Sequence, residues 1–249
     1  MRTNDEFNPV DLRSAFAARL TDPFLSESLF DHLSDIVYFV KDDAGRYVVV
    51  NETLVKRCGK KKKSELIGKN ASDLFDDATG ARFLEQDLAL IRSRAPLVNE
   101  LERHPYTAHS SGWCLTTKLP LSDPQGNVIG LVGMSRDLQS PGDDASDLNR
   151  LAQLIEHAKT HLDQPLRVNA FAKQVGMSNY QLDRRCREVY GVSPSQLILQ
   201  LRMGAAATKL RQTRDPILSI ALDVGYSDQS AFTRQFRRTF GVSPGKYRG

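Results

Sequence analysis

Two rows of arginine in the C-terminal part of the chain have the types and spacing for clear chemistry. Arg184 and Arg187 lie three positions apart, and Arg234 and Arg237 repeat that spacing 50 positions later. At about 100° per residue each pair falls on one face of a helix, opposite the apolar residues of the same helix. A guanidinium on an exposed helix face can donate paired hydrogen bonds to guanine or bond to phosphate. The spacing therefore predicts two helices that contact double-stranded DNA.

No comparable pattern indicates catalysis or a metal centre. The sequence has no glycine-rich phosphate loop, and its three cysteines, Cys58, Cys114 and Cys186, match no zinc spacing and no disulfide framework. We therefore expect a protein that is not an enzyme and that binds no metal. Scattered cysteines are typical of a reducing cytoplasm, and no apolar run approaches the ~18 residues of a membrane span. We expect a cytoplasmic protein without a membrane partner.

The charge is distributed unevenly along the 249 residues. The chain has 34 basic and 30 acidic residues, a net charge of +4. Residues 1–145 contain 18 basic and 22 acidic residues, whereas residues 146–249 contain 16 and 8, so the two parts carry −4 and +8. A positive unit joined to an acidic one favours nucleic-acid binding confined to the C-terminal part.

A repeat in that part predicts the elements that position the arginines. The motif Val-Gly-x-Ser occurs at 175–178 and 224–227, and Gly-Val-Ser-Pro occurs at 191–194 and 241–244. Glycine ends a helix in the left-handed conformation, serine caps the next helix, and proline fits its first position. Each copy therefore predicts two helices joined at a glycine turn, which is a helix-turn-helix. The second helices are expected at Asn179–Tyr190 and about 228–240.

Residues 167–248 resemble the DNA-binding domain of the AraC/XylS family of transcription regulators. The most specific part of the resemblance is IALDVGYSDQSAFTRQFRRTFGVSPGKYR, residues 220–248. The resemblance implies two helix-turn-helix units that are joined by a long helix, about Pro194 to Gln212, and that enter successive major grooves. It implies DNA-contacting positions at Asn179, Tyr180, Gln181, Asp183, Arg184, Gln229, Ser230, Ala231 and Arg234. Three arginines farther from the helix N-termini, Arg187, Arg237 and Arg238, are expected to meet phosphates.

The sequence departs from the family at two positions of the first unit. Cys186 stands where the family usually has phenylalanine, and Asp183 is an acid on the face expected to meet DNA. Asp183 either accepts a hydrogen bond from cytosine N4 or is repelled by phosphates. Base contacts are therefore better supported for the second unit than for the first.

The N-terminal part has the pattern of an α+β domain. Five segments rich in β-branched and aromatic residues predict strands at Ile36–Val40, Tyr47–Val50, Leu97–Arg103, Trp113–Leu121 and Val128–Met134. Residues 51–94 between the second and third strands are helical in character. This order predicts a five-stranded antiparallel sheet with helices on one face and a cavity between them.

Residues 24–138 resemble a PAS domain. The matching segments are FVKDDAGRYVVVN at 39–51, Leu-Ile-Gly at 66–68, Trp113 and DPQGNVIGLVGMSRDL at 123–138. The resemblance implies a sensor whose closing residues, Asp137 and Leu138, transmit a conformational change to the C-terminal part of the chain.

A small, largely apolar effector is the default ligand for such a cavity. The residues expected to line the cavity are Tyr38, Val40, Leu54, Phe83, Leu101, Trp113 and Met134, although each could serve only in core packing. Photoactive-flavin relatives carry a cysteine where this chain has Ala71, and residues 78–92 contain no histidine for haem, so neither cofactor is expected. His104 is expected to be a surface or turn residue. An empty domain that serves only homodimerisation is the rival hypothesis.

These patterns predict a transcription regulator with a sensor and a DNA-binding output. The expected divisions are an N-terminal extension (1–23), a PAS-like domain (24–138), a linker rich in Pro, Gly, Ser and Asp (139–147) and a DNA-binding domain (148–249). RNA polymerase is a further partner in this hypothesis. The alternative is a ligand-binding or dimerisation module whose helix-turn-helix units bind other proteins.

Overall fold

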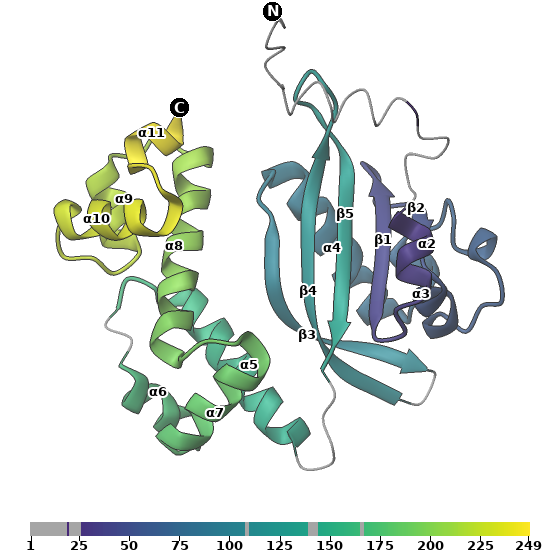
Figure 1. Cartoon of the computed structure of the whole chain (residues 1–249), viewed down its shortest axis with the longest axis horizontal. Coiled ribbons are helices and arrows are strands. Elements are labelled where there is room, and N and C mark those ends of the chain that lie inside the picture. The colour runs from purple at the N-terminus through teal and green to yellow at the C-terminus, as the bar shows by residue number, and fades with distance from the viewer. Residues whose placement is uncertain (1–18, 20–25, 108–109, 139–143, 165–166) are drawn as a thin grey trace, which may run out of the picture.

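The computed structural model describes residues 19, 26–107, 110–138, 144–164 and 167–249. A five-stranded sheet with its helices precedes a helical region that continues to the C-terminus (Figure 1). Apart from Arg19, the predicted N-terminal extension lies outside the described residues. The predicted α+β region followed by an all-α region is confirmed.

All five predicted strands are present and form one antiparallel sheet in the order β2-β1-β5-β4-β3. Their bounds are β1 (Ile36–Asp42), β2 (Tyr47–Val50), β3 (Leu97–Thr107), β4 (Ser110–Ser122) and β5 (Val128–Asp137). The first and last strands pair at the centre of the sheet, with Val37 opposite Ser135 and Phe39 opposite Gly133. The β1–β2 turn depends on Gly45, whose φ of 76° is a conformation that favours glycine.

Alternation along β1 defines two faces of the sheet. Val37 and Phe39 pack into a core with α3 (Glu52–Arg57) and α4 (Asp77–Ser93), and we call this side the inner face. Two 3₁₀ turns, Lys63–Glu65 and Ala71–Asp73, complete this layer. On the outer face, Tyr38 stacks on Phe30 of α2 (Ser26–Asp31) with ring centroids 4.2 Å apart. Helices therefore pack on both faces of the sheet, not only on the one that the sequence predicted.

The helical region contains the two predicted helix-turn-helix units. Its elements are α5 (Asp144–Thr160), α6 (Val168–Gln174), α7 (Asn179–Tyr190), α8 (Pro194–Gln212), α9 (Ile217–Asp223), α10 (Gln229–Phe240) and α11 (Pro244–Arg248). The first unit is α6–α7 and the second is α9–α10, and α8 connects them (Figure 1). Each unit buries its own apolar cluster, because Leu182 belongs to one cluster and Phe232 to another.

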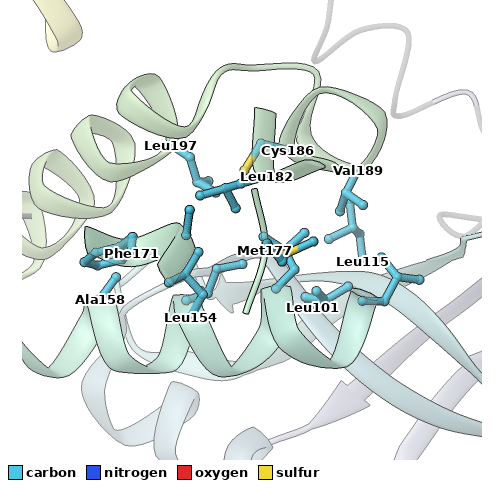
Figure 2. Packing of buried hydrophobic residues seen from close by; sticks show 14 residues of the cluster. Leu101, Leu115, Leu154, Ala158, Phe171, Met177, Leu182, Cys186, Val189 and Leu197 are labelled. Atoms are coloured by element: carbon cyan, nitrogen blue, oxygen red, sulfur yellow. The ribbon is translucent and has the colours of Figure 1, made fainter. Parts of the chain in front are cut away.

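The outer face of the sheet also packs against the first unit. Leu101 of β3 and Leu115 of β4 join the buried cluster formed by α5, α6, α7 and α8, beside Val189 (Figure 2). We call this group the sheet–helix cluster. An ion pair of 2.6 Å joins Lys159 of α5 to Glu100 of β3. The sheet and the first helix-turn-helix unit therefore share one apolar core.

The end of the predicted linker is helical in the structure. Residues 144–147 form the start of α5, and residues 139–143 lie outside the described part of the chain. Among the described residues, no helix is long and apolar enough to cross a membrane, and no three His, Cys, Asp or Glu side chains are placed to hold a metal ion together.

Candidate nucleic-acid interface and effector cavity

Local capping sets where α7, the candidate recognition helix of the first unit, begins and ends. The backbone N–H of Gln181 donates to the Ser178 hydroxyl at 3.2 Å, and the backbone N–H of Ser178 donates to the Gln181 side-chain oxygen at 2.8 Å. The two residues form a capping box around the predicted serine cap, and it satisfies two donors that the first turn leaves free. Gly191 ends the helix with a φ of 71°. The predicted bounds of this helix, Asn179–Tyr190, are confirmed.

The candidate recognition helix of the second unit, α10, is capped by an aspartate instead. The backbone N–H of Ala231 donates to the Asp228 carboxylate at 2.8 Å, and Gly241 ends the helix with a φ of 77°. A carboxylate at a helix N-terminus also interacts favourably with the helix dipole. The preceding turn is close-packed, because a side chain at Gly225 would lie 2.4 Å from the Leu162 carbonyl oxygen.

One face of α7 is buried and the opposite face is exposed. Leu182, Cys186 and Val189 are buried in the sheet–helix cluster. Burial raises the pKa of the Cys186 thiol to about 12, so this residue is a packing group at neutral pH. The exposed face carries five of the predicted DNA contacts: Asn179, Tyr180, Gln181, Arg184 and Arg187. Tyr180 is 75% exposed, which is unusual for an aromatic side chain.

Acidic side chains pair with the arginines on α7. Asp183 accepts a hydrogen bond from Arg187 at 2.7 Å, and Arg184 lies 3.3 Å from Glu188. The hydrogen bond and charge of Asp183 raise the pKa of Arg187. The half-buried Asp183 therefore acts first on its own helix, and its two predicted roles toward DNA remain open.

Arg185 has a structural role that the sequence pattern did not reveal. Its side chain is buried and lies 3.3 Å from Asp147 of α5 and 2.7 Å from Glu188. It therefore ties the N-terminal part of α5 to the first recognition helix. Only its position on the inward side of the helix, next to Cys186, could have separated it from the exposed arginines.

The exposed face of α10 contrasts with that of α7 in charge. Phe232 and Phe236 are fully buried, and Phe240 packs beside them. The opposite face exposes Gln229, Ser230, Arg234, Arg237 and Arg238, while Ala231 is half-buried. In the described part of the chain, no acidic side chain lies within ion-pair distance of these three arginines. Their positive charge is therefore directed to solvent.

Between the inner face of the sheet and helices α3 and α4 lies a cavity of about 30 Å³. It is lined by Val37, Phe39, Lys41, Tyr47, Leu54, Arg57, Phe75, Phe83, His104, Pro105, Lys118 and Ser135. Of the seven residues predicted to line it, only Leu54 and Phe83 do so.

The other five predicted lining residues are placed elsewhere, and that prediction was wrong for them. Tyr38 and Val40 point to the outer face because they alternate with Phe39, and Met134 shares that face because it pairs with Tyr38. Leu101 and Trp113 pack in or against the sheet–helix cluster. The sequence located the strands correctly, but the lining residues were chosen for apolarity and not for alternation.

Charged side chains that the sequence analysis missed lie on the inner face. Lys41 of β1 and Lys118 of β4 contact the two oxygens of the buried Asp87 carboxylate at 2.5 and 2.6 Å. Burial lowers the pKa of both lysines, although Asp87 opposes the shift. Arg57 of α3 pairs with Asp137, the last residue of β5. The position of Lys41, two residues after Phe39, was the available signal, because alternate residues share a face.

His104 is not the surface residue that the sequence suggested. It lies in β3, lines the cavity and contacts Glu102 at 3.2 Å. Burial lowers the pKa of His104 despite this carboxylate, so the imidazole is neutral at pH 7. Burial opposes ionisation of Glu102 as well, but the contact with His104 and the charge of Lys118 lower the pKa of Glu102 to about 2.

Known proteins resemble this chain in two separate parts. A helix-turn-helix domain model matches residues 171–249, and a PAS fold model matches residues 30–141. The regulatory protein SoxS of Salmonella typhimurium is 43% identical over 95 residues, which are 38% of this chain and 89% of SoxS. The right origin-binding protein of Escherichia coli is 39% identical over 98 residues, which are 39% of this chain and 34% of that protein. A solved AraC-type transcriptional regulator from Chromobacterium violaceum aligns with 30% identity and a TM-score of 0.39, over 42% of this chain and 93% of that chain.

Proposed function

Because this chain belongs to the AraC/XylS family of DNA-binding transcription regulators, we propose that its two helix-turn-helix units read two successive major grooves of one operator. The exposed face of α10 carries this proposal: three arginines point to solvent, and no acid of the described residues lies within ion-pair distance of them. The net charge of +8 on residues 146–249 favours the same surface, since duplex DNA is a polyanion.

We assign base recognition in the second unit to the first half of α10. Gln229, Ser230 and Arg234 are exposed there, and the N-terminal half of a recognition helix is the part that reaches base edges. Arg234 can donate a bidentate pair to guanine. Arg237 and Arg238 lie in the last turns and are assigned to phosphates, while half-buried Ala231 can offer its methyl group to a thymine.

In the first unit we assign base recognition to Asn179, Tyr180, Gln181 and Arg184, with Arg187 at a phosphate. The acids on α7 reduce its net attraction to DNA, because Arg187 is already paired with Asp183 and Arg184 with Glu188. We therefore assign the larger share of the affinity for DNA to the second helix-turn-helix unit.

The PAS-fold part is proposed to sense a small effector in the cavity and to control the DNA-binding part. Arg57 lines the cavity and pairs with Asp137, and the chain continues from β5 through residues 139–143 to α5. The sheet also packs on the first unit through Leu101 and Leu115. A change at the cavity can therefore reach α7 through the chain and through the shared core.

Four further proposals complete the function. Leu119 is 45% exposed on the outer face beside Leu121 and Val132, and this apolar surface is the proposed site of homodimerisation. RNA polymerase is a further proposed partner, and the cytoplasm is the proposed place of action. We keep the functional boundary between sensor and output within residues 139–147.

Selection of duplexes from random-sequence DNA by the full chain tests this function. We expect enrichment of a site with two half-elements about 10–10.5 base pairs apart. The Arg234→Ala variant should lose preference in one half-element only. Absence of any enriched sequence would favour the alternative, in which the helix-turn-helix units bind other proteins.

A further inference from the structure

The cavity on the inner face has an uneven distribution of charge. Three cationic side chains line it, Lys41, Lys118 and Arg57, together with the imidazole of His104. None of its twelve lining residues is acidic. The carboxylates that balance these cations lie behind the wall, as Asp87 does for both lysines. A ligand in the cavity therefore meets hydrogen-bond donors and no carboxylate.

The ammonium group of Lys41 has hydrogen-bond donors that Asp87 does not use. The Lys41 side chain is 2% exposed, its ammonium group has three donors, and Asp87 is the only hydrogen-bond partner of that group among the described residues. Its remaining surroundings are aromatic, since Nζ lies 4.1 Å from the ring centroid of Tyr47 and 5.2 Å from that of Phe39. Lys118 by contrast contacts both Asp87 and Gln86.

The rest of the wall is apolar and the space is small. Phe39, Phe75, Phe83, Val37 and Leu54 form this part of the lining. A volume of about 30 Å³ admits roughly two water molecules, at about 10–15 Å³ of this measure for each. The cavity therefore fits a compact ligand with one charged end and a short apolar body.

Building on the proposed sensor function, we propose that the effector is a small monocarboxylate whose carboxylate binds Lys41 and Arg57. This proposal differs from the expectation of a largely apolar effector. Arg57 is the residue that links the site to the output, because it also holds Asp137 at the end of β5. A ligand carboxylate competes with Asp137 for the same guanidinium. Binding therefore weakens the ion pair that holds the end of β5, from which the chain continues to α5.

Thermal unfolding of the full chain with matched acids and amides tests the proposal. The acids are acetate and propionate, each compared with its uncharged amide at equal concentration and with ionic strength matched by sodium chloride. We expect at least one acid to stabilise the fold while its amide does not. At ten times its Kd, a ligand that binds only the folded state raises the folding equilibrium constant about elevenfold. No stabilisation by any acid, or equal stabilisation by acid and amide, would overturn the proposal.

Two variants test whether stabilisation by the acid arises at Lys41. Lys41→Met should abolish stabilisation by the acid, whereas Lys56→Met, at an exposed position of α3, should keep it. Retained stabilisation in Lys41→Met would refute the assigned site. If Lys41→Met does not unfold cooperatively, the comparison of acid with amide on the unmodified chain still decides.

DNA binding measured in parallel separates this proposal from the proposed function. Sequence-specific DNA binding without any acid effect would overturn the ligand class alone. An acid-specific effect without sequence-specific DNA binding would overturn the regulator and leave the ligand site in place.

Discussion

Asp87→Asn is the substitution that most directly tests the charge balance of the inner face. Asp87 is fully buried and is the carboxylate that contacts both Lys41 and Lys118. Asparagine has nearly the same shape and keeps one oxygen acceptor, so the change removes mainly the negative charge. Two buried ammonium groups then lack their closest counter-charge.

The expected loss of stability is large. Removal of one partner from a buried ion pair costs about 3–5 kcal/mol, and here one carboxylate serves two cations. For a chain of this size, 1 kcal/mol corresponds to roughly 2–4 °C in Tm, so we expect a decrease of about 6–20 °C. The matched control is Glu85→Gln on the same helix, since Glu85 is 70% exposed and pairs with an exposed arginine. Its effect should remain within about 0.5 kcal/mol.

The effect should also depend on pH in a defined direction. Burial lowers the pKa of Lys41 and Lys118, so between the lowered folded values and 10.5 the unfolded chain binds more protons than the folded chain. Stability therefore rises with pH in that interval, and the loss caused by Asp87→Asn should be smaller there than at lower pH, where the folded chain keeps both ammonium groups charged.

Urea unfolding followed by fluorescence of Trp113, the single tryptophan, provides the measurement. A triple variant with Asp87→Leu, Lys41→Met and Lys118→Met should recover most of the lost stability. A cost below about 1 kcal/mol for Asp87→Asn, equal to that of Glu85→Gln, would refute the reasoning.

Three further predictions address DNA contact, the shared core and pH. Arg234→Ala should weaken operator binding by about 1–3 kcal/mol and relax preference at one base pair in fluorescence anisotropy titrations; equal weakening on all sequences would make Arg234 a phosphate contact. Leu115→Ala should cost about 2–5 kcal/mol in urea unfolding, since Leu115 is buried between the sheet and the first helix-turn-helix unit, and a cost near zero would contradict that packing. Because burial lowers the pKa of His104, the free energy of unfolding should fall as the pH decreases from 6.5 toward the lowered folded value, and a profile that is the same in His104→Gln would contradict this.

Local sequence signals predicted the elements of this protein well. The bounds Asn179–Tyr190 are set by Ser178 and Gln181 at one end and Gly191 at the other, because capping depends on residues close in sequence. Strand positions were predicted from β-branched and aromatic runs for the same reason.

Contacts between distant segments were predicted poorly. Leu101 and Trp113 are apolar strand residues, and nothing local distinguishes a residue that lines a cavity from one that packs on α5 and α7. Which face of β3 and β4 meets the helical region is decided by tertiary packing. The exposed face of each helix, α7 and α10, was predicted better than the lining of the cavity, since exposure on a single amphipathic helix needs only its own periodicity.

The burial of Lys41 beside the cavity was not predicted, for a different reason. Lys41 follows an apolar run, and a lysine at the end of a strand is expected to face solvent. Its burial depends on Asp87, which is 46 residues away. A search for charged residues in phase with the apolar face of a strand would have found it.

Hydroxyl-radical footprinting of the full chain on its selected operator tests the central claim most directly. If α7 and α10 both enter major grooves, protection should appear in two patches on one face of the duplex, about 10–10.5 base pairs apart. Arg234→Ala should weaken one patch and Arg184→Ala the other. A single protected patch, or protection spread evenly without phase, would contradict recognition by two helix-turn-helix units.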